Sequence, residues 1–225
     1  MENEIETRIS EALADGKPIR VRLYALLQKT EEELNTIVTS VLDKYNKPDL
    51  LGAVYTSVKE LALNGAKANI KRILFHEMDI DPENEESYKK GMAAFKTKLT
   101  EEFISDYANK ARNANLFVDV KFDYNPDRLI VEVINNSAMS EKEDYRVREK
   151  FKKGSQYDNI AEFYMDMQDN AEGAGMGITL ILMLLKAEGI DPHLFTIKSD
   201  YKTKTYAKVE FPLSDSYVPE RKSFS

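Results

Sequence analysis

Apolar residues recur at helical spacing in four stretches of the chain, which predicts four helices with buried faces. In the first stretch, for example, Leu34, Ile37 and Val41 fall on one side of a helix. The last stretch is apolar almost all round, so we expect it to be buried on every side. Gly189 follows it directly, and glycine is favoured just beyond the end of a helix. The four predicted helices span residues 31–45, 50–76, 88–112 and 178–188.

An alternation of apolar and polar residues marks a second kind of segment and predicts strands with one buried face. Val118, Val120 and Phe122 alternate with charged residues, and turn-forming residues at 125–127 join this strand to a partner. A polar turn at 200–204 joins a similar pair near the end of the chain. The predicted strands span residues 18–24, 118–122, 129–134, 195–199 and 205–211.

The order of these elements predicts an α+β fold. We expect a two-layer α/β sandwich whose mixed, mostly antiparallel sheet is covered on one face by helices. No linker rich in Gly, Ser or Pro divides the chain, so residues 1–225 are interpreted as one domain. Within it, residues 1–49 are an N-terminal strand and helix extension, and residues 214–225 are a loose tail. Residues 140–170 lack apolar periodicity, which predicts an irregular segment with short helices.

The composition narrows the choice of partners and compartments. Hydrophobic residues make up 42% of the 225 positions, which is too apolar for a disordered chain. A formal net charge of −7 argues against nucleic acid, because phosphate-backbone binding needs basic surface. The absence of cysteine excludes disulfides, thiolate zinc sites and cysteine nucleophiles. We find no apolar signal segment, and the apolar run at 178–185 is too short to span a bilayer, so we expect a cytoplasmic protein without membrane contact.

The first group of residues with chemical potential is Glu60, Asn64 and Lys67. Their spacing of i, i+4 and i+7 places a carboxylate, an amide and an ammonium on one helix face. The amide oxygen can ligate Mg²⁺, the ammonium can meet phosphate, and the carboxylate can orient a water or a hydroxyl. The same row also fits a solvated helix face with one ion pair, and composition alone favours that second interpretation.

The second group is a glycine-rich segment directly before the buried helix, where Gly173, Gly175 and Gly177 alternate in Glu-Gly-Ala-Gly-Met-Gly. Glycines let the backbone approach a ligand, and the free N–H groups of a helix start attract anions. A flexible turn into a helix would give the same pattern. No strand precedes the glycines and no Gly-Lys-Ser/Thr follows them, which argues against a Rossmann fingerprint and a P-loop.

Together and in this order, the two groups resemble the ATPase superfamily of gyrase, heat-shock-90 chaperones, histidine kinases and mismatch-repair proteins (GHKL). Glu-x-x-x-Asn-x-x-Lys resembles its N box, and Glu-Gly-Ala-Gly-Met-Gly-Ile-Thr-Leu resembles its second glycine box. Residues 160–164 lie where histidine kinases carry a phenylalanine box, and residues 195–213 resemble the closing hairpin of the family. The resemblance covers residues 50–213 and implies a histidine-kinase-like ATPase fold.

The resemblance implies a role for each candidate residue. Asn64 is expected to bind Mg²⁺, Lys67 to bind phosphate, and Glu60 to orient a water or hydroxyl in catalysis. Asn135 is expected to accept a hydrogen bond from adenine. The implied ligands are ATP or ADP together with Mg²⁺. The glycines expected to contact the phosphates are Gly173, Gly175 and Gly177.

The first glycine box departs from the pattern of this superfamily. Where the family carries Asp-x-Gly-x-Gly, the chain reads Asn-Asn-Ser-Ala-Met at 135–139. The amide oxygen of Asn135 can still accept a hydrogen bond, but it lacks the charge that strengthens such a bond. Met139 stands in place of a glycine, and we expect it to narrow or fill the adenine pocket.

Residues 140–170 correspond to the nucleotide lid of the superfamily and contain five cations. Each cation could contact phosphate or could balance acidic neighbours on an exposed helix, and for each one taken singly we favour the second role. The five are Arg146, Arg148, Lys150, Lys152 and Lys153. The two histidines, His76 and His193, lack the sequence context of a phosphoacceptor, and we expect neither to accept phosphate or bind metal.

Two functions fit these observations. The first is an ATP- or ADP-binding signalling module, similar to a stand-alone histidine-kinase catalytic domain of a two-component system or to an anti-sigma-factor kinase. Whether it acts as a protein kinase or as an ATPase stays open. The second is a protein-interaction module on a degenerate ATPase fold without nucleotide. Either function implies a protein partner, and the helix before Asp49 could form a homodimer surface or simply cover the sheet.

Overall fold

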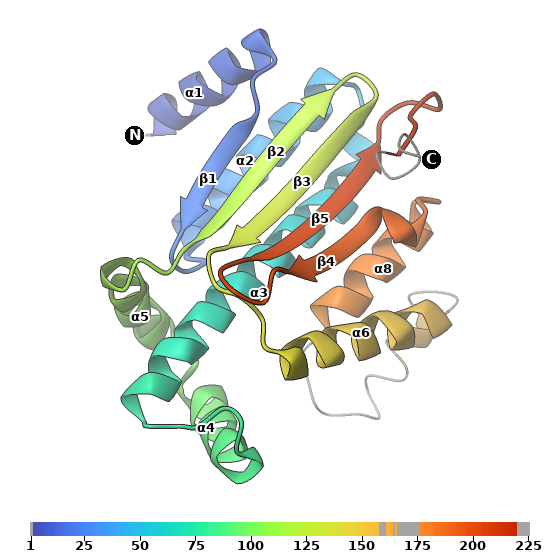
Figure 1. Ribbon diagram of the computed structural model, residues 1–225. Helices are drawn as coiled ribbons and strands as arrows, with labels where there is room; N and C mark the ends of the chain where they lie inside the picture. Colours follow the sequence, from blue (N-terminus) through green and yellow to red (C-terminus); the bar gives the residue numbers. More distant parts are fainter. Residues whose placement is uncertain (1, 158–160, 164, 166–175, 220–225) are drawn as a thin grey trace.

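The computed structural model describes residues 2–157, 161–163, 165 and 176–219 (Figure 1). Its helices are α1 (Glu2–Asp15), α2 (Gln28–Lys44), α3 (Leu51–Glu77), α4 (Glu85–Lys98), α5 (Glu101–Asn113), α6 (Glu141–Gln156) and α8 (Gly177–Ala187). Its strands are β1 (Ile19–Leu23), β2 (Val118–Asn125), β3 (Arg128–Asn135), β4 (Phe195–Ser199) and β5 (Thr205–Pro212). Short 3₁₀ helices at Pro48–Leu50 and Pro192–Leu194 precede α3 and β4.

The strands form a single sheet in the order β1-β2-β3-β5-β4. Each neighbouring pair is antiparallel, and the β2–β3 pairing runs from Val118 opposite Asn135 to Asn125 opposite Arg128. This arrangement confirms the α+β class and the two-layer sandwich. The expected mixture of parallel and antiparallel pairs is not found among the described strands. Two hairpin turns make the β2–β3 and β4–β5 pairs antiparallel, and the second hairpin docks through β5 against β3.

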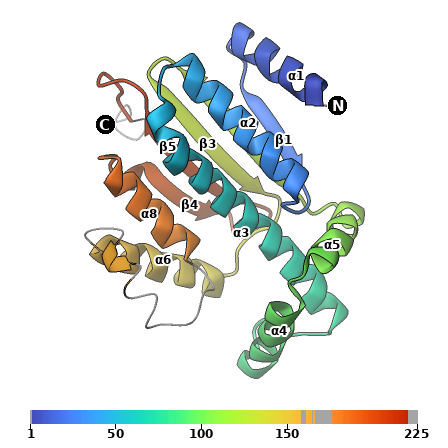
Figure 2. The same ribbon diagram turned by 180° about the vertical axis from the view of Figure 1, so that it is seen from behind.

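Helices α2, α3 and α8 cover one face of the sheet, and Figure 2 shows them crossing it from that side. Along the strands, side chains that face these helices alternate with side chains that face away from them. Val120 and Phe122 of β2 and Leu129 and Val131 of β3 point into this interface and have no exposed area. Full burial of such a side chain contributes roughly 1.5–3 kcal/mol. The interface between the sheet and the three helices is therefore the main core of the protein.

On the opposite face of the sheet, Figure 1 shows no helix of the described residues lying across the strands. Charged side chains pair there between neighbouring strands. Arg22 of β1 donates two hydrogen bonds to Asp119 of β2, at 2.8 and 2.9 Å. Lys121 of β2 donates to Glu132 of β3 at 3.0 Å. Both pairs are partly buried, and Asp119 itself is buried. They pair the charges on this face of the sheet.

A smaller apolar cluster lies away from the sheet, around the C-terminal half of α3. Ile70 and Leu74 of α3 pack there with Phe95 of α4 and Tyr107 of α5. Figure 2 shows α4 and α5 beyond the edge of the sheet on this half of α3. The long helix α3 thus connects the main core to a separate helical unit.

The prediction of a single helix over residues 88–112 is wrong, because two helices occupy this stretch. α4 ends at Lys98, and Thr100 begins α5 as its N-cap. The side-chain oxygen of Thr100 accepts a hydrogen bond from the backbone N–H of Phe103 at 3.2 Å. Such a cap satisfies an amide that the first turn of a helix leaves unpaired. The apolar periodicity continues through the break, which is why the pattern concealed it.

The prediction of an irregular segment at 140–170 is wrong for its first half, which forms α6. Ser140 and Glu143 form a capping box, in which each side chain bonds the backbone N–H of the other residue. This motif stabilises the start of a helix that has little apolar periodicity. Residues 158–160, 164 and 166–170 of the expected lid lie outside the described residues.

Both ends of the chain are more ordered than the sequence predicted, as far as they are described. Residues 2–15 form the helix α1, which was not predicted. In the expected loose tail, Ser214 donates to Asp127 and the hydroxyl of Tyr217 donates to Glu210. Residues 220–225 lie outside the described part. Across the described residues, we find no helix that combines the length and the apolar character needed to cross a bilayer.

The cap between α4 and α5 can be tested by substitution. We expect Thr100→Ala to lower the free energy of unfolding by about 1 kcal/mol, because one amide of the first turn loses its partner. Thr97→Ala is the matched control, since the Thr97 hydroxyl bonds only to carbonyl oxygens of its own helix. Urea unfolding followed by circular dichroism measures both. Equal stabilities of the two variants would contradict the capping role.

Candidate functional site

The candidate site is built around α3, which lies close to the sheet at Gly65. A Cβ atom added at Gly65 would lie only 2.9 Å from Cγ2 of Val118. A glycine inside a helix costs about 1 kcal/mol relative to alanine, and this close approach explains its presence. The Gly65 carbonyl oxygen also accepts a hydrogen bond of 3.1 Å from Nδ2 of Asn135, the last residue of β3. The motif-bearing stretch of α3 is therefore tied directly to the end of β3.

The first residue of α8, Gly177, faces the motif residues of α3. A Cβ atom at Gly177 would lie 2.3 Å from Oε2 of Glu60 and 3.2 Å from Nδ2 of Asn64. Only glycine leaves these two side chains where they are. The geometry thus brings Glu60, Asn64 and Gly177 together, as expected from the order of the motifs. Gly173 and Gly175 lie outside the described residues, so their contribution stays a prediction.

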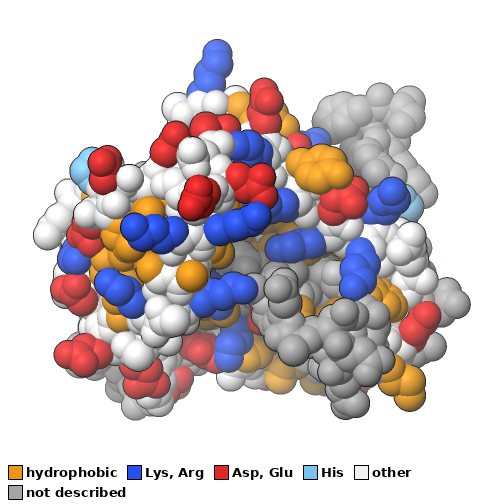
Figure 3. Space-filling view, turned by 90° about the horizontal axis from the view of Figure 1, so that it is seen from below, with side chains coloured by type: hydrophobic (Ala, Val, Ile, Leu, Met, Phe, Trp, Pro, Cys, Tyr) orange, Lys and Arg blue, Asp and Glu red, His pale blue; other side chains and the backbone are white. Residues whose placement is uncertain are grey.

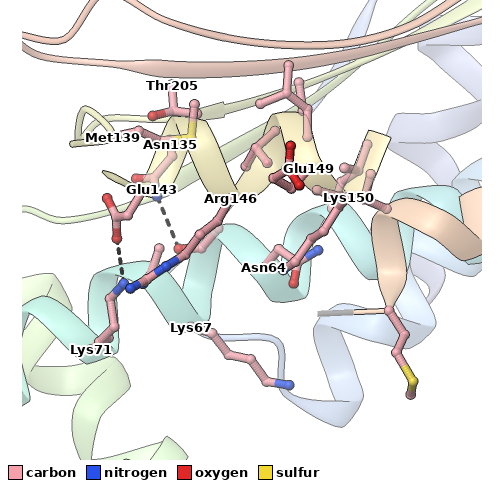
Figure 4. Close-up of a pocket in the computed structure, with 18 of the residues that line it drawn as sticks. Asn64, Lys67, Lys71, Asn135, Met139, Glu143, Arg146, Glu149, Lys150 and Thr205 are labelled. Carbon is pink, nitrogen blue, oxygen red and sulfur yellow. Dashed lines mark hydrogen bonds and ion pairs between the residues drawn. The ribbon is translucent and has the colours of Figure 1, made fainter. Parts of the chain in front are cut away.

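A cavity of about 1140 Å³ opens between α3, α4, α6, α8 and the sheet. Asn64 and Lys67 line it from α3, and Asn135 lines it from the end of β3. Glu60 is not one of the lining residues and lies beside Gly177 instead. Figure 4 shows Lys67 extending in a different direction from Asn64, away from Asn135. The predicted residues therefore share one region, but they do not converge on one point.

Met139 does not fill the cavity beside Asn135. The sequence predicted that this residue would narrow or fill the adenine pocket. Both side chains line the same open cavity, together with Thr205 of β5 (Figure 4). Met139 is half-buried, and its backbone N–H donates to the Ser199 hydroxyl at 3.0 Å. That bond fixes the backbone of Met139 at the wall of the cavity, and whether its side chain narrows an adenine pocket stays a prediction.

Asn135 is buried and already has partners within the protein. Its Nδ2 donates to Gly65, and its Oδ1 lies 3.0 Å from the Ser137 hydroxyl. The same hydroxyl lies 2.8 Å from Oδ1 of Asn69, and a single hydroxyl proton can serve only one of these acceptors at a time. An amide oxygen has two lone pairs, so Oδ1 of Asn135 retains capacity to accept one further hydrogen bond from a ligand.

The cavity is strongly basic although the chain as a whole is acidic. Among the described residues, six cationic side chains line it against two carboxylates, whereas the formal net charge of the protein is −7. Figure 3 shows Lys and Arg side chains gathered across the middle of the corresponding face. The cations are Lys67, Lys71, Arg72, Arg146, Lys150 and Lys153, and the carboxylates are Glu143 and Glu149. Concentrated positive charge of this kind attracts anionic ligands.

Helix α6 is fastened across the cavity from both sides. Glu143 pairs with Lys71 and, at 3.4 Å, with Arg72 of α3. On the sheet side, Asp144 accepts a hydrogen bond of 2.8 Å from the hydroxyl of Tyr201, in the β4–β5 turn. Burial alone would raise the pKa of Glu143, but the charges of Lys71 and then Arg72 outweigh it, so this pKa lies below its ordinary value.

Lys150 of α6 projects into the cavity without a carboxylate partner among the described residues. Burial lowers the pKa of Lys150, and the nearby charges of Arg146 and then Lys71 lower it further. An ammonium held in a partly buried place beside other cations is stabilised when an anion binds. Figure 4 shows Lys150 reaching from α6 toward Asn64. These features make Lys150 the strongest phosphate-contacting candidate on α6.

The sequence interpretation missed part of this basic lining. Lys71 follows Lys67 by one helical turn, so the spacing that selected Asn64 and Lys67 could also have found Lys71. On α6 the exposed-helix interpretation suits Arg148, which pairs with Asp144 at 2.8 Å. It does not suit Lys150. The sequence signal for these two roles is weak, because the apolar stripe of α6 is narrow and consists of Val147 and Phe151, which pack against the core.

The described residues show no cluster of three His, Asp or Glu side chains that could hold a metal ion. His193 is exposed, lies in the short 3₁₀ helix before β4, and has its Nδ1 2.9 Å from Oδ1 of Asp191. His76 lies in the last turn of α3 and is exposed. The carboxylate of Glu60 and the amide of Asn64 are hard oxygen donors beside the start of α8. Mg²⁺ often binds through one or two such oxygens together with phosphate oxygens.

Comparisons with known proteins give one informative match. An uncharacterized protein of Treponema pallidum (strain Nichols) is 30% identical to this chain over 190 residues. The match covers 84% of this chain but 37% of that protein. The chain therefore spans little more than a third of the length of this relative. No protein-family model matches the chain, and no solved structure matches it.

The ion pairs of Glu143 predict a pH dependence of stability. A carboxyl group with a lowered pKa in the folded chain stabilises the fold above its unfolded pKa, ordinarily 4.5, and this stability is lost as the pH falls through the folded pKa. We expect Glu143→Gln to unfold more easily than wild type at neutral pH. The difference should shrink as the pH falls below that ordinary value. Urea unfolding over a pH series measures it.

Lys71→Gln is the partner variant for this test. It should remove part of the same pH-dependent difference, because Arg72 still pairs with Glu143. If the stability gap between wild type and Glu143→Gln stays constant over the whole pH series, the ion pairs are not its cause.

Proposed function

We propose that the protein is a nucleotide-binding signalling module that holds ATP or ADP in the basic cavity. The observation that carries this proposal is the contact between Gly177 at the start of α8 and Glu60 and Asn64 of α3. Two sequence motifs that are weak by themselves meet in space beside a cavity with an excess of positive charge. A helix start that faces such a cavity suits the binding of phosphate groups.

Each part of a nucleotide has a candidate partner in this arrangement. Asn135 and Thr205 line the cavity at the end of the sheet, where a base would lie against apolar side chains such as Val133 and Ile197. The phosphates would lie toward Asn64 and Lys150. Mg²⁺, when bound with the nucleotide, would neutralise phosphate charge next to the Asn64 amide oxygen. Glu60 would orient a water or hydroxyl from its place beside Gly177.

The second candidate is a protein-interaction module without nucleotide. The internal hydrogen bonds of Asn135 favour it, because the residue expected to recognise adenine is already engaged with Gly65 and Ser137. The open space beside Met139 favours nucleotide binding instead, because a degenerate site would be expected to close there. We therefore rank the nucleotide module first. Kinase or ATPase activity, the protein partner, homodimer formation and a cytoplasmic location remain predictions from the sequence.

Two substitutions on α3 test the proposed site. Asn64→Ala should weaken ATP binding mainly when Mg²⁺ is present, because an oxygen ligand of the metal is lost. Lys67→Ala should weaken binding with or without Mg²⁺ by about ten- to a hundredfold, the equivalent of a charge-assisted contact of roughly 1.5–3 kcal/mol. Calorimetric titration with ATP and ADP, with and without Mg²⁺, measures both effects.

Neither substitution should unfold the protein, because Asn64 is exposed and Lys67 is half-buried. Lys96→Ala, an exposed lysine on α4 outside the cavity lining, is the matched control and should bind as wild type does. Nucleotide binding that survives both α3 substitutions would overturn the residue assignment. An absence of binding by wild type would favour the interaction module.

A further inference from the structure

The end of the cavity next to α4 is formed by side chains that the proposed nucleotide site does not use. Tyr88 of α4 lies between two cations: Cζ of Arg146 is 4.5 Å from the ring centroid, and Nζ of Lys71 is 5.9 Å from it. Arg146 also donates a hydrogen bond to the Tyr88 hydroxyl. Met92 and Phe95 line the cavity beyond Tyr88 and give this end an apolar wall.

These groups hold more hydrogen-bond donors than the described part of the protein satisfies. A guanidinium has five N–H donors and an ammonium has three. Among the described residues, Arg146 uses one donor on Tyr88, and Lys71 uses one on Glu143. The Tyr88 hydroxyl accepts from Arg146, so its own proton remains for donation. Glu143 is shared with Arg72 and cannot satisfy the whole set.

Arg146 and Lys71 lie near Lys150 and lower its pKa, but the side chains of the two α6 cations point in different directions. Arg146 and Lys150 lie one turn apart on α6, yet Figure 4 shows Lys150 reaching toward Asn64 and Arg146 toward Lys71. Phosphates next to Asn64 and Gly177 would meet Lys150 and leave Arg146 beside Tyr88. The cavity also has the room, since its volume of about 1140 Å³ exceeds that of most small-molecule sites, roughly 300–1,000 Å³.

We propose that Arg146, Lys71 and Tyr88 form a second anion subsite, which takes a phosphate group separate from the polyphosphate chain. The guanidinium and the ammonium supply charge, and the phenol donates a hydrogen bond. The proposed function supplies the nucleotide that occupies the end of the cavity next to α8. The second subsite itself does not depend on that function. The second phosphate is carried either by the same nucleotide or by a separate small molecule.

The first experiment titrates pyrophosphate into the protein saturated with ATP, followed by calorimetry and by amide chemical shifts of α4 and α6. Wild type should bind one further equivalent, and Arg146→Gln should lose it or bind it about tenfold more weakly. Lys150→Gln should instead weaken ATP itself. Lys152→Gln is the matched control, because Lys152 is an exposed cation of α6 outside the cavity lining and should change neither titration.

A second experiment identifies the source of the phosphate. Adenosine 3′,5′-bisphosphate is compared with adenosine 5′-monophosphate in wild type and in Arg146→Gln. A preference for the bisphosphate that disappears in Arg146→Gln supports a second phosphate on the same ligand. Equal affinities, together with pyrophosphate binding beside ATP, support a separate anion.

The variant Tyr88→Phe helps to decide whether Arg146 binds an anion or only holds α4 and α6 together. The variant keeps the ring and frees Arg146 from the hydroxyl, so the second anion should bind within about threefold of the wild-type affinity. If Arg146 only fastens α4 to α6, Arg146→Gln will lower stability and leave the second anion unaffected, which overturns the proposal. Failure of wild type to bind the second anion at millimolar concentration overturns it as well.

The two proposals fail in different ways. If ATP does not bind but pyrophosphate occupies two places in the free protein, one of them lost in Arg146→Gln, the nucleotide proposal is wrong and the second subsite stands. If ATP binds and its affinity falls equally in Arg146→Gln and Lys150→Gln, while no second anion binds, both cations serve one polyphosphate and the second subsite is wrong.

Discussion

The close contact between α3 and β2 at Gly65 is the constraint on which the arrangement of the site depends. A side chain at this position would push the helix away from Val118. The helix would then lose the hydrogen bond between its Gly65 carbonyl oxygen and Asn135. Because α3 is one continuous helix of 27 residues, its position at Gly65 also sets where Glu60, one turn earlier, meets Gly177. One glycine therefore aligns the sheet, α3 and the start of α8.

The distribution of charge is the second organising feature. Acidic side chains dominate the chain, yet basic side chains from α3 and α6 converge on a single cavity. Bringing cations together costs electrostatic energy, and the protein offsets only part of that cost through Glu143. The remaining field favours an anionic occupant. A polar network of this kind is typical of a binding site and has little use in a structural core.

Much of the fold follows from periodicity in the sequence. The helix at 50–76, the buried helix before Gly189 and both strand pairs match the observed elements to within a few residues. Two predictions fail where periodicity carries little information. A break at Thr100 leaves the apolar stripe intact, and α6 has only a narrow apolar face, Val147 and Phe151, beside its capping box and its ion pairs with α3. α1 was not predicted, although Ile5, Ile9 and Leu13 recur at helical spacing and pack against the core.

The features of the candidate site also fall into those that the sequence predicted and those that it could not. The sequence alone determined that Glu60, Asn64 and Lys67 share a helix face and that a glycine begins the buried helix, because helical geometry follows from local spacing. The tertiary structure alone decided that Gly177 touches Glu60 and Asn64 and that Asn135 bonds Gly65. It also decided that Lys150 and Arg146 face the cavity while Arg148 does not. Such contacts join residues far apart in the chain, and only the packing of α3, α6 and α8 against one another selects them.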